Sequence, residues 1–195
     1  MSKPLLVAID ACVREGESRT RRIAEPILEA LSHRYHVVKI DLPSRADLSP
    51  LHPDSFAQRM AGQIPDDYKE MASFIAQVKR IVIVAPFWDM SFPAVLKCFI
   101  EQVSLFGITF EDNGTTCVGL CKRPKVLYIT TRGMDIKTGG KLEQATPYLK
   151  ALSALWNLGA LITIAAQNMD YSSPEEIEAK ISACIAEGME LAKKW

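Results

Sequence analysis

Two hydroxyls and two arginines lie close together in the stretch DACVREGESRTRR, residues 10–22. Ser18 and Thr20 stand where a helix is predicted to begin, and Arg14 and Arg19 are near them. The first N–H groups of a helix have no partner within it, and such groups, hydroxyls and guanidinium ions all bind oxyanions. This stretch therefore predicts a binding site for a monoester phosphate. The alternative is a serine N-cap beside solvated arginines.

The same helix start carries an unfavourable excess of positive charge. Arg19, Arg21 and Arg22 are crowded at the positive end of the helix dipole, where each cation costs about 0.3 to 1 kcal/mol. Local rules of this kind are most often broken where function compensates. We therefore expect a bound anion to neutralise Arg14 or Arg19, and we expect Arg21 and Arg22 to face solvent.

A second candidate region is the aromatic loop PFWDMSFPAVLK, residues 86–97. Large apolar side chains on a loop cost solubility unless they cover something flat or pack against a partner. The rigid indole of Trp88 suits stacking on one side of a planar ring. Between Pro86, at the strand end, and the next helix lie Phe87, Trp88, Met90 and Phe92. The alternative is that these side chains only close the end of a sheet.

The third candidate region is the loop TTRGMDIKTGG, residues 130–140. Its glycines allow backbone N–H groups to come close to a ligand. By itself the stretch is an ordinary loop. Taken together, phosphate contacts, aromatic rings and backbone donors on three loops predict a site for a mononucleotide with a flat ring.

Short β-branched runs alternate with amphipathic segments along the chain, a pattern typical of βαβ units. We predict strands at residues 5–9, 36–41, 81–85, 125–130 and 160–165. We predict helices at residues 19–33, 66–79, 93–105, 142–158 and 174–193. Unbroken apolar strands such as IVIVA imply burial on both faces, so the fold class is α/β, a three-layer, doubly wound single domain over residues 1–195. In such a sheet the ligand lies beyond the carboxyl ends of the strands, where the three loops are.

Pro26 conflicts with the first predicted helix. A proline there removes the hydrogen bond to the carbonyl of Arg22 and costs about 3 kcal/mol in a helix interior. We therefore expect either a kink at this position or a helix that begins later than residue 19.

The composition argues against several functional classes. The chain of 195 residues carries 23 basic and 23 acidic residues, so it has no net field to attract nucleic acid or a membrane surface. The five cysteines form no CxxC pair and the three histidines lack a ligand spacing, which argues against a disulfide framework or a metal site. The first apolar run is too short for a signal peptide. We therefore expect a cytoplasmic protein without a metal, a nucleic-acid partner or a membrane span.

Five stretches together resemble the FMN-dependent NAD(P)H azoreductase and quinone oxidoreductase family. They are ESRT before the first helix, PFWDMSFPAVLK after the third strand, GITFEDNG in a hairpin-like insert, TTRGM after the fourth strand and ATPYL in the fourth helix. The resemblance covers most of the chain, and its specificity comes from the five stretches in combination. It implies a flavodoxin-like α/β/α fold with a five-stranded parallel sheet of order 2-1-3-4-5 and FMN where the winding reverses.

The resemblance also implies which residues would contact each part of FMN. Ser18, Arg19 and Thr20 would hold the phosphate, and the loop around Arg132 and Gly133 would supply donors to the N1 and O2 edge of the ring. The isoalloxazine would be lined by Phe87, Trp88, Asp89 and Met90, and its pyrimidine side would meet Thr131, Arg132, Gly133 and Met134. Three positions depart from the family pattern: Cys12 where serine is common, Asp89 where asparagine is common and Met134 where glycine is common.

The implied activity is hydride transfer from NADH or NADPH through FMN to a quinone, an azo compound or a second flavin, in a homodimer. The main alternative is a non-enzymatic flavin electron carrier, which tends to be acidic, whereas this chain has balanced charge and an extra hairpin. A low-molecular-weight phosphatase would need a spacing between Cys12 and Arg19 that is one residue shorter. A receiver-type switch would need paired acids at the end of the first strand, and Ile9 precedes Asp10.

Overall fold

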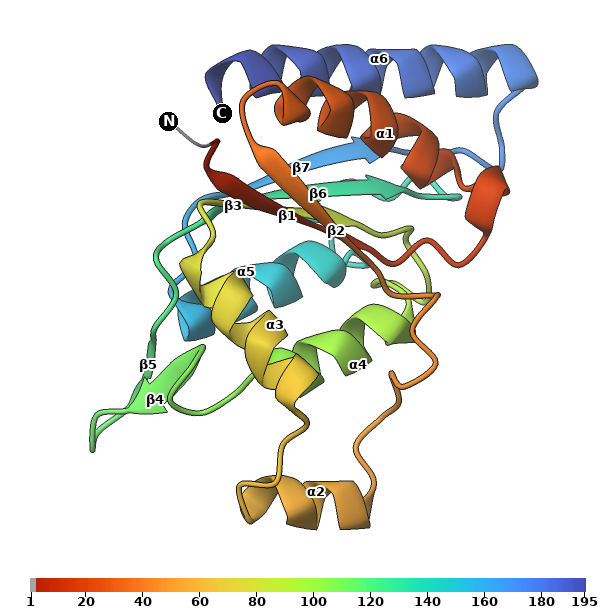
Figure 1. Ribbon diagram of the computed structural model, residues 1–195. Coiled ribbons are helices and arrows are strands. Elements are labelled where there is room, and N and C mark those ends of the chain that lie inside the picture. Colours follow the sequence, from red (N-terminus) through yellow and green to blue (C-terminus); the bar gives the residue numbers. More distant parts are fainter. Residues whose placement is uncertain (1–2) are drawn as a thin grey trace.

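A five-stranded parallel sheet forms the centre of the protein (Figure 1), and the computed structural model describes residues 3–195. The strand order is β2-β1-β3-β6-β7. The strands are β1 (Leu5–Asp10), β2 (His36–Asp41), β3 (Arg80–Val84), β6 (Lys125–Thr131) and β7 (Leu161–Ala166). Counted without the small hairpin, this is the predicted 2-1-3-4-5 order, so the predicted flavodoxin-like sheet is confirmed.

Helices cover both faces of the sheet (Figure 1). One layer holds α1 (Arg19–Ser32) and α6 (Pro174–Lys194), and the other holds α3 (Asp66–Gln77), α4 (Ala94–Val103) and α5 (Ala145–Trp156). Alternate residues of β1 explain the need for two layers: Leu6 and Ala8 pack in the core under α1 and α6, whereas Val7 and Ile9 pack in the other core. A strand buried on both sides must be apolar throughout, and this is the run that the sequence shows.

Four short elements lie outside the predicted set of strands and helices. These are the 3₁₀ turn η1 (Glu15–Glu17), α2 (Pro53–Met60) and the strands β4 (Phe110–Asp112) and β5 (Cys117–Gly119). The strands pair antiparallel as a hairpin below the main sheet (Figure 1), at the hairpin-like insert that the resemblance implied. No residue of α2, which is described throughout, is buried, and its two large apolar side chains, Phe56 and Met60, are exposed. The helix is also short, so the sequence gives only a weak helical pattern here.

Helix α1 begins at Arg19 and continues through Pro26. Of the two expectations for this proline, a later start is therefore wrong. The Ser18 side chain caps the helix by accepting a hydrogen bond from the backbone N–H of Arg21 at 3.2 Å. The loop between the end of β1 and the start of α1 thus carries the predicted phosphate site.

Arg21 does not face solvent as expected. Its Nε donates to the Asp10 carboxylate at 2.8 Å, and another guanidinium nitrogen lies 3.5 Å from Asp41, so the side chain joins α1 to the ends of β1 and β2. Arg22 is about half exposed and pairs with Glu178 of α6 at 2.7 Å. Carboxylates of other elements therefore compensate the cations that the helix dipole disfavours.

Within residues 3–195, no helix has the length and apolar character needed to cross a bilayer.

The longest helix, α6, begins with a Ser173 cap and a Glu176 side chain that accepts from the Ser173 N–H at 2.8 Å. The first turn of α6 carries the acidic residues Glu175 and Glu176, and its last turn carries Lys193 and Lys194. The reciprocal cap and this distribution of charge along the helix dipole both stabilise the helix.

Candidate functional site

One pocket lies beyond the carboxyl ends of β1, β3 and β6, where the three predicted loops meet. Its lining residues are Arg14, Glu17, Ser18, Arg19, Thr20, Pro86, Phe87, Trp88, Thr131, Arg132, Gly133, Met169 and Asp170. Among the predicted site residues, all of which the structure describes, only Asp89, Met90 and Met134 are not part of the lining. The additional residues Glu17, Met169 and Asp170 were not expected from the sequence.

The start of α1 forms one end of the pocket. Ser18 and Thr20 are buried, and the Thr20 hydroxyl lies 2.7 Å from that of Thr131 at the end of β6. This contact fixes the first turn of α1 against the sheet. The N–H groups of Arg19 and Thr20 belong to that first turn, so neither has a partner in the helix itself. The pocket therefore has anion-binding groups at this end.

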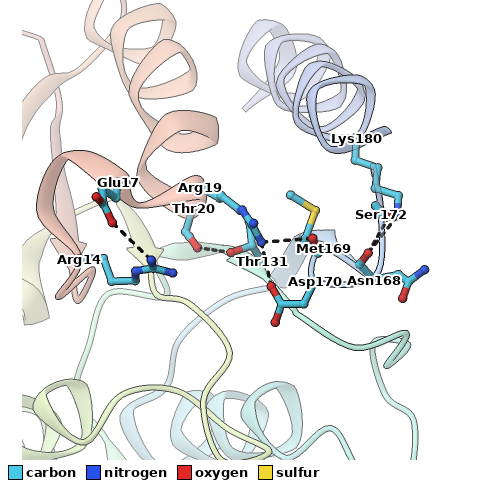
Figure 2. Close-up of polar contacts among 10 residues, drawn as sticks. All are labelled: Arg14, Glu17, Arg19, Thr20, Thr131, Asn168, Met169, Asp170, Ser172 and Lys180. Carbon is cyan, nitrogen blue, oxygen red and sulfur yellow. Dashed lines mark hydrogen bonds and ion pairs between the residues drawn. The ribbon is translucent and has the colours of Figure 1, made fainter. Parts of the chain in front are cut away.

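Both arginines at this end pair with carboxylates of the protein (Figure 2). Arg19 donates to Asp170 Oδ1 at 2.9 Å and to the carbonyl oxygen of Met169 at 3.3 Å. Arg14 lies 3.3 Å from Glu17 Oε2. The pocket thus contains two cations and two anions, and the two arginines that were expected to meet a bound anion already have protein carboxylates as partners.

The loop after β7 brings Asp170 to the pocket. The N–H groups of Asn168, Met169 and Asp170 donate to the carbonyls of residues 134, 132 and 133, each at 3.0 Å. A Cβ atom on Gly133 would lie 2.0 Å from Asp170 Oδ2. A side chain at position 133 would therefore displace the Asp170 carboxylate from its place in the pocket. A charged residue after the last strand, at the edge where ligands bind, is the signal that could have identified Asp170.

Helix α6 holds the same loop from outside (Figure 2). Lys180 Nζ donates to Ser172 Oγ at 2.5 Å and lies 3.4 Å from the carbonyl oxygen of Asn168. The Ser172 hydroxyl donates to the same carbonyl oxygen at 2.7 Å. Asn168 itself has a left-handed backbone, with φ of 58°, a conformation that asparagine tolerates better than most residues. The position of Asp170 is thus set by a network of hydrogen bonds.

A tight turn forms the aromatic end of the pocket. Trp88 and Ser91 exchange backbone hydrogen bonds of 3.1 and 2.8 Å, and the two residues between them, Asp89 and Met90, have φ values of 46° and 64°. A turn with two left-handed central residues normally selects asparagine, aspartate or glycine, so Met90 is strained. The Gln144 N–H donates to the Met90 carbonyl at 2.8 Å and supports the turn. The indole of Trp88 is left 41% exposed.

Arg132 has a structural environment that the sequence did not predict. Its side chain is fully buried, and its guanidinium donates to the Ile136 carbonyl at 2.7 Å and to Thr138 Oγ1 at 3.0 Å. The guanidinium also lies 3.9 Å from the fully buried Glu143 carboxylate and 5.5 Å from the centre of the Phe87 ring. These contacts engage the side chain within the loop. The Arg132 N–H is also engaged, because it donates to the Ala166 carbonyl at 2.8 Å. The backbone N–H of Gly133, rather than this guanidinium, is the part suited to a ligand.

Cys12 is fully buried beside Asp10, whose Oδ1 accepts from the Cys12 N–H at 2.8 Å. Burial raises the pKa of its thiol to about 12. A thiol with this pKa is protonated at neutral pH and is a poor nucleophile. The phosphatase alternative therefore fails on the state of the thiol as well as on its spacing from Arg19.

A protein family described by its flavodoxin-like fold matches residues 5–190. The chain belongs to this family. The FMN-dependent NADH:quinone oxidoreductase of Clostridium perfringens is 29% identical over 203 residues, and the match covers 100% of both chains. The protein of the same name from Caldicellulosiruptor saccharolyticus is 30% identical over 144 residues, which are 73% of this chain and 71% of the relative. The resemblance seen in the five stretches is confirmed.

Solved structures agree with this family membership. An azoreductase from Bacillus anthracis has a TM-score of 0.83 at 20% identity and covers 100% of both chains. An FMN-dependent NADH-azoreductase from the same species, in complex with FMN, has a TM-score of 0.81 at 20% identity, with 100% of this chain and 99% of that chain covered. At this level of identity the likeness shows the shared fold of the family.

Proposed function

We propose that this protein is an FMN-dependent oxidoreductase that passes hydride from NADH to quinone or azo acceptors, as a single FMN-binding domain over residues 1–195. The observation that carries the proposal is the joining, in one pocket, of the first turn of α1, the Trp88 turn and the backbone around Gly133. The names of the relatives support the enzyme over a non-enzymatic flavin carrier and support NADH as the donor.

The residues present fit FMN at each of its parts. The first-turn N–H groups of α1, the Ser18 hydroxyl and Arg19 would hold the phosphate, with Arg14 beside them. Trp88 and Phe87 provide aromatic surface for the ring. Gly133 lines the pocket without a side chain, so the backbone there can approach a ligand edge.

When bound, FMN supplies the hydride chemistry. The protein would contribute binding and orientation. Trp88 and Phe87 would exclude water from the reacting region, and the backbone N–H of Gly133 would stabilise negative charge at the ring edge. The Arg132 N–H is not free for this role, because it donates to the Ala166 carbonyl at 2.8 Å. Asp89 is exposed and outside the pocket lining, which keeps its carboxylate from adding a repulsive charge there.

We further propose a cytoplasmic homodimer. Exposed apolar side chains on the loops around the site are the support for the dimer: Trp88, Met134 and Leu142. Such groups are costly in water and suit a protein interface. All five cysteines are free thiols, and Cys117 is exposed, which suits a reducing compartment. Light scattering of the purified protein gives its mass, and a monomeric mass would exclude the dimer.

The function is tested first by the visible absorption spectrum of the purified protein, before and after FMN is added. We expect a bound flavin spectrum, and we expect NADH oxidation in the presence of a quinone with the protein as sole catalyst. A protein that takes up FMN but oxidises NADH only with a separate reductase would be a carrier. A protein that remains colourless after addition of FMN would contradict the proposed function.

A further inference from the structure

The phosphate end of the pocket is neutral by the protein's own charges. Arg14 and Arg19 are balanced by Glu17 and Asp170, and all four side chains line the same pocket. A monoester phosphate carries a charge of about −1.5 to −2 at neutral pH. An incoming phosphate therefore meets two carboxylates as well as two guanidinium groups.

The two ion pairs differ in how firmly they are held. The Arg14 and Glu17 side chains are 66% and 82% exposed and are neighbours in sequence, so solvent weakens their interaction. Arg19 is 35% exposed and Asp170 is 66% exposed, and Arg19 has a second acceptor in the Met169 carbonyl. Asp170 is also held in place, because its N–H donates to the Gly133 carbonyl and Lys180 holds the rest of its loop. Asp170 is thus the carboxylate with the stronger hold on a pocket arginine.

We propose that Asp170 is a specificity-determining residue that competes with the phosphate of the ligand for Arg19. This inference rests on the proposed function, since it concerns the phosphate of FMN. Both protein contacts of Arg19 use Nη1, and carboxylates and phosphates bind guanidinium nitrogens in the same way. A phosphate that takes Nη1 must displace Asp170, and one that binds the other guanidinium nitrogens shares the charge of Arg19 with Asp170. The presence of Asp170 reduces the net gain in binding free energy that the phosphate obtains from Arg19. It therefore lowers the preference of the site for FMN over riboflavin.

The test is titration of FMN and of riboflavin, at fixed ionic strength, into the wild type and Asp170→Asn. Asparagine keeps the size of the side chain and removes its charge. We expect FMN to bind about 3-fold to 10-fold more tightly to the variant, because an exposed ion pair is lost and a like charge is removed. Riboflavin has no phosphate, and its affinity is expected to change less than about 2-fold.

The chain offers a matched control in Glu178→Gln. Glu178 pairs with Arg22 at 2.7 Å, near the same end of α1, but it does not line the pocket. This variant also removes an arginine-paired carboxylate, and it is expected to leave both affinities unchanged. An equal gain in Asp170→Asn and Glu178→Gln would attribute the effect to overall charge and would overturn the inference.

A double-variant cycle with Arg19→Ala tests the route of the effect. If Asp170 acts by occupying Arg19, the gain from Asp170→Asn is largely lost in the Arg19→Ala background. A gain of full size in that background would mean direct repulsion of the phosphate and would overturn competition.

Unchanged or weaker FMN binding by a folded Asp170→Asn variant, with circular dichroism like that of the wild type, would also overturn the inference. If the variant does not fold, Asp170→Ser in the same titrations decides in the same way. A wild type that binds neither flavin would instead refute the proposed function.

Discussion

The two ends of the pocket are held in place by different means. At the α1 end, charged side chains from distant parts of the chain pair with one another, as Arg19 does with Asp170 at 2.9 Å. At the aromatic end, a backbone turn with Asp89 and Met90 in the left-handed region leaves Trp88 exposed. A charged ligand group must therefore replace existing partners at the first end, whereas a flat ring needs to displace no polar partner at the second. Binding of phosphate and binding of ring should respond to different substitutions.

The largest expected effect concerns the support of the aromatic end. Arg132 is fully buried, touches the Phe87 ring face and lies 3.9 Å from the fully buried Glu143. Replacing Arg132 by Met leaves the Glu143 charge without this partner, so the free energy of unfolding should fall by about 3 to 5 kcal/mol. Urea unfolding measures this. The control is Arg22→Met, which breaks a half-exposed pair with Glu178 and should cost less than about 1 kcal/mol. Equal decreases in the free energy of unfolding would show that the buried pair stabilises the protein no more than the half-exposed pair does.

The second effect concerns the charged end alone. Arg19→Ala should weaken FMN binding about 10-fold to 100-fold, because hydrogen bonds to charged groups contribute about 1.5 to 3 kcal/mol. Riboflavin affinity should hardly change, because riboflavin lacks the phosphate. Titration at fixed ionic strength gives both constants, with Arg22→Ala as the control outside the pocket. An equal loss for the two flavins would mean that Arg19 supports the loop without contacting the phosphate.

The third effect concerns the aromatic end alone and should not distinguish between the two flavins. Trp88→Ala should weaken FMN and riboflavin by the same factor, about 10-fold, since aromatic stacking on a flat ring contributes about 1 to 3 kcal/mol. The emission of bound flavin should also rise, because the indole no longer quenches it. Phe106→Ala removes another exposed aromatic side chain that is not in the pocket lining and serves as control. Unchanged affinity and emission in Trp88→Ala would place the indole in another role, such as a dimer contact.

The smallest effect tests the strain in the Trp88 turn. Met90→Gly should raise the free energy of unfolding by about 0.5 kcal/mol, because relief of a left-handed backbone exceeds the entropy cost of glycine. Met134→Gly is the matched control, since Met134 is exposed and has no positive φ, and it should lower the same quantity slightly. Thermal and urea unfolding of both variants give the comparison. A loss of stability in both would show that the Met90 side chain contributes more than its backbone costs.

Periodicity allowed most of the fold to be predicted. The five main strands and the helices around them appear near the predicted residues, because each buries an apolar face that the sequence shows as a pattern. The rule that ligands bind beyond the carboxyl ends of parallel strands then placed the loops at residues 10–22, 86–97 and 130–140 at one edge, and the pocket joins them. Helix α2 was missed because it is short and buries no residue.

Charge pairing was decided by the tertiary structure. The sequence placed Arg19, Arg21 and Arg22 at a helix start and left their partners open, and the fold supplies Asp170, Asp10 and Glu178. Arg19 and Asp170 are 151 positions apart. Any carboxylate can pair with an arginine, so the sequence does not indicate which carboxylate will be its partner. Burial follows from local pattern, but the partner of a charge follows from which loops the completed sheet brings to one edge.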